Sequence, residues 1–160
     1  MQKFGYFIEN EYKGNKIYCV NGMYMSYLEC DYSYDSIDGV RNRIDNPHLV
    51  PATQFLFIRK SDNKLVGMIQ IRHRFNDFLE KYAGHIGYSV RPSERRKGYA
   101  KEMLKTALPF CLQIGINKVL IACIDGNTGS EKTILANGGL YESTVHEPNG
   151  DRDLKRFGIT

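Results

Sequence analysis

Three consecutive cations, Arg95, Arg96 and Lys97, stand directly before Gly98 and an apolar helical run. The N-terminus of a helix already carries partial positive charge, because its first N–H groups have no partner within the helix. Cations at this position destabilise the helix unless something negative binds there. The preceding residues read as a strand that ends at Val90. We therefore expect strand, loop and helix to form a concavity of backbone N–H groups that suits phosphate oxygens.

Gly98 and Ala100 keep the start of this helix free of large side chains. A side chain at position 98 would hold a pyrophosphate away from the helix end, whereas the neighbouring cations can form charge-assisted contacts with it. Two common phosphate loops do not fit. The sequence contains neither Gly-Lys-Ser/Thr, which a P-loop needs, nor the G-x-G-x-x-G of dinucleotide-binding folds.

The pattern Arg95-x-x-Gly98-x-Ala100, led in by "YSVRP" at residues 88–92, resembles the acyl-CoA pyrophosphate motif of the GNAT superfamily, the Gcn5-related N-acetyltransferases. After a helix and a buried strand, Asn127, Ser130 and "NGG" at 137–139 match the family's next helix. The resemblance covers about residues 53–158. It implies acetyl-CoA as co-substrate, an amine as acceptor, and no metal.

The resemblance also implies where the co-substrate lies. The pyrophosphate would sit on the backbone amides of the loop, and the pantetheine arm would pair with the backbone near Tyr88 to Val90, where two parallel strands splay apart. Asn127 and Ser130 would lie near the pantetheine or the CoA end. The cofactor-binding residues implied are Tyr88, Ser89, Val90, Arg95, Arg96, Lys97, Gly98, Tyr99, Ala100, Asn127 and Ser130.

The implied reaction is direct attack of the amine on the acetyl thioester, which requires a route for the amine proton and a donor for the developing oxyanion. A strand amide near Val90 is the natural oxyanion donor. His85 is the predicted general base, since it lies near the start of the motif strand and titrates in the useful range. The family commonly has a tyrosine acid seven residues after the asparagine, but that position is Ile134 here. Thiolate protonation is therefore left to solvent, to Tyr141 or to another group.

The elements that must position these residues form a mixed α/β order: hairpin, strand, helix, strand, helix, hairpin. Their predicted ranges are a hairpin over 54–73, a strand over 84–90, a helix over 99–114, a strand over 118–124, a helix opened by a capping box at 128–131, and a hairpin over 140–159. Pro109 predicts a kink near Lys105 that can divide the first helix into two short pieces. The resemblance implies a GNAT-like acyl-CoA N-acyltransferase fold, with a central, mostly antiparallel sheet, a parallel splayed pair and flanking helices.

Residues 1–50 show weak periodicity, and no opening strand can be identified in them. Residues 33–44 fit a short helix. The acidic and aromatic run at 27–35 could bind a cationic amine, although a mobile surface loop is the favoured interpretation. We expect one domain over 1–160, with 1–50 as a variable acceptor-side segment and 53–158 as the cofactor-binding core.

The composition of the chain excludes several classes of protein. With 160 residues, of which 42% are hydrophobic, the chain can bury one substantial core. A net charge of +4 is too low for a dedicated nucleic-acid binder, and no apolar run of membrane-spanning length occurs. The widely spaced Cys19, Cys30, Cys111 and Cys123 read as reduced, mostly buried thiols. We expect a cytoplasmic protein without nucleic-acid or membrane partners, and leave open whether it forms a homodimer.

Two other functions stay open at this point. A protein that keeps the fold and binds acyl-CoA without chemistry would act as a sensor or as a protein-interaction module. The run "RRKGYAK" at 95–101 could instead be a nucleic-acid patch, against which the modest charge counts.

Overall fold

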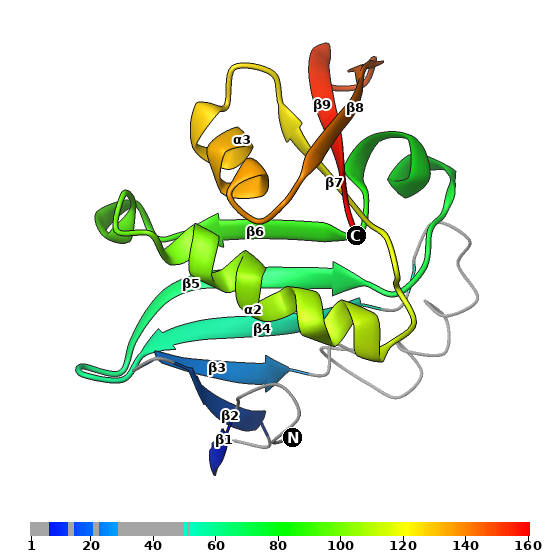
Figure 1. Cartoon of the computed structure of the whole chain (residues 1–160). Helices are drawn as coiled ribbons and strands as arrows, with labels where there is room; N and C mark the ends of the chain where they lie inside the picture. The colour runs from blue at the N-terminus through cyan, green and yellow to red at the C-terminus, as the bar shows by residue number, and fades with distance from the viewer. Residues whose placement is uncertain (1–6, 13–14, 21–22, 29–49, 51) are drawn as a thin grey trace.

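The computed structural model of the chain describes residues 7–12, 15–20, 23–28, 50 and 52–160 (Figure 1). Within these ranges nine strands form one sheet in the order β1-β2-β3-β4-β5-β6-β7-β9-β8. The strands are β1 (Phe7–Tyr12), β2 (Asn15–Val20), β3 (Met23–Leu28), β4 (Ala52–Arg59), β5 (Lys64–Arg72), β6 (Ile86–Val90), β7 (Val119–Ile124), β8 (Leu140–Glu147) and β9 (Arg152–Ile159). The helical elements are the π-helix η2 (Leu79–Ala83), the 3₁₀ turn η3 (Pro92–Glu94), and the α-helices α2 (Tyr99–Gln113) and α3 (Thr128–Leu135).

The sheet divides between β6 and β7, its parallel pair. These two strands share a single register pair, Ile86 opposite Ile121. Beyond that point β6 stays with β5, whereas β7 follows β9 over its whole length. The strands therefore diverge toward their carboxyl ends, and Figure 1 shows β7 rising away from β6. The predicted fold class, a mostly antiparallel sheet with a splayed parallel pair, is confirmed.

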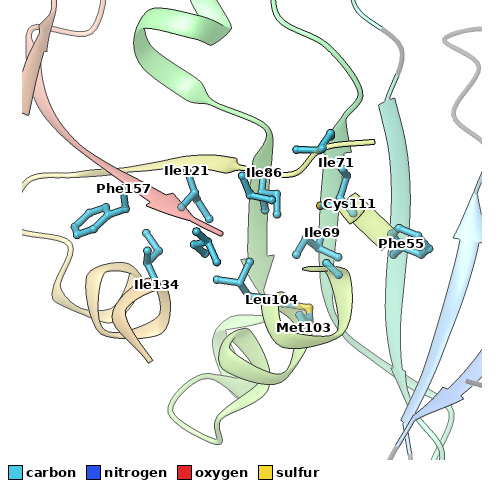
Figure 2. Packing of buried hydrophobic residues seen from close by; sticks show 14 of the residues in the cluster. Phe55, Ile69, Ile71, Ile86, Met103, Leu104, Cys111, Ile121, Ile134 and Phe157 are labelled. Atoms are coloured by element: carbon cyan, nitrogen blue, oxygen red, sulfur yellow. The ribbon is translucent and has the colours of Figure 1, made fainter. Parts of the chain in front are cut away.

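One hydrophobic core holds both halves of the sheet together. It runs from Phe55 on β4 to Phe157 on β9 and includes Ile134 of α3 (Figure 2). Helix α2 covers one face of the sheet and buries Met103, Leu104, Ala107 and Cys111, which recur at the predicted spacings of three and four. Truncating such a buried leucine or methionine to alanine typically destabilises a domain by about 2–5 kcal/mol.

Helix α2 runs unbroken through Pro109, so the predicted division into two short helices is wrong. Proline removes the N–H that would bond the carbonyl four residues earlier, here that of Lys105. Lys105 lies on the exposed side of the helix, where water can bond the freed carbonyl. The helix ends where predicted, because Gly115 takes a positive φ of 86° just after its last turn.

Helix α3 begins one residue earlier than the capping-box prediction requires. Its N-cap is Asn127, whose side-chain oxygen accepts from the backbone N–H of Ser130 at 3.1 Å, and Thr128 is the first helical residue. The Glu131 carboxylate, which a capping box would direct back to the N-cap, contacts Lys155 at 3.2 Å instead. The glycine stop is as predicted, with Gly138 at φ 83°.

Both predicted hairpins form, β4–β5 and β8–β9. The first 50 residues, in which the sequence reveals no strand, supply β1 to β3. The helix predicted over 33–44 lies outside the described residues, as does most of the run 27–35, of which residues 27 and 28 end β3. Cys111 and Cys123 are buried free thiols, and burial raises the pKa of Cys111 to about 12. None of the helices in the described ranges has the length and apolarity needed to cross a membrane.

Candidate functional site

A pocket of about 500 Å³ opens where β6 and β7 part, a volume typical of ligand sites. Its walls are the end of β6, the loop that follows it, the first turn of α2 and the first turn of α3. Ten of the residues predicted to bind the cofactor line it: Tyr88, Ser89, Val90, Arg95, Arg96, Gly98, Tyr99, Ala100, Asn127 and Ser130. The fold thus brings together segments that lie about forty residues apart in sequence.

The loop between β6 and α2 has an unusual backbone. Arg95 is extended, whereas Arg96 adopts a positive φ of 62° and Gly98 one of 83°. A non-glycine residue in this left-handed region is strained, and such strain concentrates at functional sites. Gly98 is the N-cap of α2 and has no side chain to cap it. The first N–H groups of the helix therefore face the pocket as anion donors.

Gly98 also leaves space above the helix end. A Cβ atom added there would meet no protein atom within 4 Å, so the volume next to the helix start is open to a ligand. The nearby Gly67 is different, because a Cβ atom there would lie 2.8 Å from the carbonyl oxygen of Ser89. Glycine at position 98 therefore allows the positive φ and leaves room for a ligand, whereas glycine at position 67 allows close packing inside the protein.

The three loop cations do not lie alike. Arg95 and Arg96 are exposed and line the pocket, and Arg95 Nε donates to the carbonyl oxygen of Val90 at 3.2 Å. Lys97, predicted to contact the same anion, is not among the lining residues. Its Nζ lies 2.9 Å from Oε2 of Glu94, a buried carboxylate that attracts it. Two of the three cations are therefore directed to the pocket.

The end of β6 offers backbone groups to the pocket. The backbone N–H of Arg91 donates to the carbonyl oxygen of Val66, so the backbone groups of Arg91 are directed toward β5. Alternate residues of a strand direct their N–H and C=O groups to opposite neighbours. Tyr88 and Val90 therefore direct theirs toward β7, which has already diverged. An extended ligand in the gap could pair with them.

Tyr88 and Ser130 meet across this pocket. The phenol oxygen of Tyr88 lies 2.7 Å from Oγ of Ser130, which joins β6 to the first turn of α3. Burial raises the pKa of the Tyr88 phenol, so the group stays protonated at neutral pH. Asn127 lies beside this pair, and its side-chain oxygen accepts the N–H of Ser130 as the N-cap of α3. The pocket thus contains a protonated phenol hydrogen-bonded to a hydroxyl.

His85 lies at the other end of β6 and is 8% exposed. Its Nδ1 accepts a hydrogen bond from Leu120 N at 2.9 Å, and its ring packs on Phe75 with centroids 4.0 Å apart. Burial, aided by the charge of Arg72, lowers the pKa of His85 to about 4. The ring is therefore neutral at pH 7. Because Nδ1 is the acceptor, the other nitrogen carries the proton, and neither has a free lone pair for an amine proton.

The two positions considered for a general acid lie elsewhere. Ile134 is fully buried in the core (Figure 2). Tyr141, the predicted substitute, is 57% exposed on β8 and is not a pocket residue. Its ring packs edge-on against Phe157, and its hydroxyl bonds that of Thr144 at 2.9 Å. Tyr141 thus lies outside the set of residues that line the β6–β7 pocket, and its role as the acid stays a prediction.

Comparison with known proteins decides the family. The family model described as "Acetyltransferase (GNAT) family" matches residues 20–137, well over half of the chain. The chain belongs to the GNAT acetyltransferase family. No curated protein sequence matches it.

Solved structures show the same GNAT fold. The ribosomal-protein-S5-alanine acetyltransferase of Vibrio fischeri is 14% identical with a TM-score of 0.62, over 89% of this chain and 95% of that one. Spermidine N-acetyltransferase of Vibrio cholerae, solved with CoA and spermine, is 14% identical with a TM-score of 0.60, over 88% and 96%. A GNAT acetyltransferase of Bacillus anthracis is 18% identical with a TM-score of 0.58, over 84% and 93%. At these identities the comparison establishes the fold.

Sequence reasoning missed four residues of the GNAT pocket: Glu94, Lys101, Gly129 and Thr133. Lys101 follows the motif by one residue, and the other three lie within the predicted loop and helix, so their positions alone could have suggested them. Glu94 differs from the rest because its ion-pair partners Arg59 and Lys64 lie at least thirty residues away. In the part of the chain that the structure describes, no group of three or more His, Cys, Asp or Glu side chains is arranged so that it could hold a metal ion.

Proposed function

We propose that the chain transfers an acetyl group from acetyl-CoA to a primary amine by direct attack in a ternary complex, within one domain over 1–160. The observation that carries this proposal is the uncapped start of α2, which faces a pocket shared with Arg95, Arg96 and the diverging end of β6. Anions bind such helix starts through N–H groups and the helix dipole. The remaining length of the pocket suits an extended arm.

Each part of acetyl-CoA has a counterpart in this site. The pyrophosphate lies on the N–H groups that follow Gly98, next to Arg95 and Arg96, and the pantetheine arm pairs with Tyr88 and Val90. Acetyl-CoA supplies the activated acetyl group that the amine attacks. The N–H of a β6 residue on the gap side donates to the developing oxyanion, in the way preorganised backbone amides stabilise such charge.

Proton transfer is assigned to Tyr88 rather than to His85 or Tyr141. As the C–N bond forms and the C–S bond breaks, the Tyr88 hydroxyl gives its proton to the departing thiolate and regains one through Ser130 from solvent. The amine loses its proton to water. His85 instead fixes β6 against β7, because its Nδ1 and its backbone N–H are both bonded to Leu120.

The experiment is an acetyl-transfer assay with purified protein, acetyl-CoA and a panel of amines, read as released CoA thiol and as mass of the product. The panel includes polyamines and peptides with free N-termini, since solved proteins of the same fold are named as a spermidine N-acetyltransferase and as an alpha-N-protein acetyltransferase. Turnover of a primary amine that is lost in R95E supports the proposal. No turnover with any amine would contradict it.

A second function is favoured by one specific observation. The position where the family commonly has a tyrosine acid is Ile134, which the core buries completely. A protein without that acid could bind acyl-CoA and act as a sensor or interaction module. In the same assay it would bind acetyl-CoA, measured by calorimetry, and release no thiol above the uncatalysed rate.

A further inference from the structure

Glu94 is the one buried residue in the exposed loop that spans residues 91–98. Its side chain is 3% exposed, whereas the Lys97 side chain is 51% exposed. A carboxylate is rarely buried unless it is paired, because removing it from water is unfavourable. The burial of this charge in an otherwise polar loop therefore requires partners.

Three cations supply them. Arg59 Nη1 lies 2.7 Å, Lys64 Nζ 2.8 Å and Lys97 Nζ 2.9 Å from the Glu94 carboxylate. The hydrogen bonds from Lys64, Arg59 and Lys97 hold the pKa of the Glu94 carboxyl well below its usual range, so the group is ionised at neutral pH. Each cation reaches it at the distance of a charge-assisted hydrogen bond.

These contacts join two separate parts of the chain. Arg59 and Lys64 face each other across the base of the β4–β5 turn, whereas Lys97 belongs to the anion loop. Arg59 also donates to the hydroxyl of Tyr99, the first residue of α2 and a pocket residue, at 3.1 Å. The β4–β5 turn is thus bonded to the start of α2 by way of Glu94 and Arg59.

We propose that Glu94 is a positioning residue for acyl-CoA binding: it draws Lys97 out of the pocket, anchors the loop to the β4–β5 turn, and so presents Arg95 and Arg96 to the pyrophosphate. The inference rests on the proposed function. The strained backbone of Arg96 is held in place because the residues that flank Arg95 and Arg96, namely Glu94 and Lys97, are bonded to each other through the Glu94 carboxylate. Preorganising a site in this way strengthens binding.

Removing the charge of Glu94 should change the affinity for acetyl-CoA in the direction opposite to the one that electrostatics alone would give. Removing a negative charge beside an anion site should tighten anion binding by Coulomb's law. If Glu94 positions the loop, E94Q instead weakens acetyl-CoA binding about tenfold, because a neutral amide cannot hold three cations and the loop loses its anchor. The KM for acetyl-CoA should rise by a similar factor, with kcat and the KM for the amine little changed.

The test is a calorimetric titration of wild type, E94Q, E94D and E102Q with acetyl-CoA, with thermal unfolding as a check on folding. E102Q removes the same charge from the first turn of α2, at a carboxylate that takes no part in the ion pairs of Glu94, and should bind as tightly as wild type or slightly more so. E94D keeps the charge and should bind between wild type and E94Q. A second arm compares K97M with R96M, which both alter exposed side chains, and K97M should weaken binding far less than R96M.

The outcomes separate the two proposals. Wild-type protein that fails to bind acetyl-CoA would overturn the proposed function, and this inference with it. Wild-type binding together with unchanged or tighter binding by E94Q overturns the inference alone. If E94Q does not fold, E94D decides, because binding by folded E94D that is as tight as that of wild type would show that the exact reach of the Glu94 carboxylate to its three cations does not matter and would overturn the inference.

Discussion

The phenol oxygen of Tyr88 on β6 lies 2.7 Å from the hydroxyl oxygen of Ser130 on α3. This contact spans the point where the parallel strands have diverged, and both residues line the pocket. It places a protonated phenol inside a site whose other lining side chains include arginines, which do not give up protons. The proposed function uses Tyr88 as the proton donor, whereas the other pocket tyrosine, Tyr99, accepts a hydrogen bond from Arg59.

Replacing Tyr88 with phenylalanine should lower kcat at least tenfold and leave the KM for acetyl-CoA within about twofold, because general acid catalysis typically contributes 10² to 10⁴ in rate. S130A should lower kcat less, since water can replace the serine. The readout is the steady-state rate of thiol release.

A tyrosine elsewhere in the pocket gives the matched comparison for Y88F. Y99F removes the hydroxyl that accepts from Arg59 and should raise the KM for acetyl-CoA rather than lower kcat. Equal loss of kcat in Y88F and Y99F, or none in Y88F, would contradict the role of Tyr88.

Substituting alanine at Gly98 should weaken acetyl-CoA binding and also destabilise the fold by about 1 kcal/mol, because an L-residue is strained at positive φ. Gly115 provides the control, with φ 86° and likewise no protein atom within 4 Å of an added Cβ. G115A should show similar destabilisation in urea unfolding and unchanged affinity. Equal affinities of G98A and G115A would count against a ligand at the start of α2.

His85→Ala should destabilise the protein by about 2 kcal/mol or more, because the buried N–H of Leu120 loses its acceptor. Asparagine can place its side-chain oxygen where Nδ1 lies, so H85N should recover part of that stability and keep the acetylation rate. A true general base would behave differently. In that case H85A and H85N would both lose activity, and the rate would no longer depend on pH near neutrality.

Stability should fall as the pH is lowered from about 6.5 to about 4. The pKa of His85 is about 4 in the folded chain and about 6.5 when unfolded, so the unfolded state binds more protons across this window. At 1.36 kcal/mol per pH unit the loss approaches about 3 kcal/mol. His73, whose pKa is also lowered by burial, adds to it in the same direction.

Urea unfolding between pH 4.5 and 7.5 measures this slope. H85N should flatten the curve across the window, leaving the smaller part that belongs to His73. The pKa of the Glu94 carboxyl is lowered, so its contribution to the free energy of unfolding is lost only at more acid pH. It therefore does not obscure the change in stability that comes from His85. A wild-type slope that persists unchanged in H85N would show that His85 is not buried and neutral as described.

The anion loop was predictable because its signals are local. A strand ending near Val90, three cations and Gly98 lie within nine consecutive residues, and each has a direct meaning for backbone conformation or charge. The cap of α3 was predicted one residue too late, since Asn127 and Thr128 are both good caps and only the fold chooses between them.

The remaining features depend on contacts between distant segments. The environment of Glu94 is set by the β4–β5 turn, more than thirty residues earlier, and that of His85 by Leu120. Strands β1 to β3 escaped prediction because none of these six-residue runs alternates strictly between apolar and polar residues. The position of Tyr141 outside the pocket lining depends on the register of the β8–β9 hairpin, which the sequence alone does not fix.

The most direct test of the central claim is a calorimetric titration of wild-type protein and R95E with acetyl-CoA, with ATP as a second ligand. Wild type should bind acetyl-CoA saturably, one to one and in preference to ATP, and R95E should lose that binding while it unfolds at the same temperature. Binding that is unchanged in R95E, or absent from folded wild-type protein, would contradict the assignment of the pocket at the start of α2 to acyl-CoA.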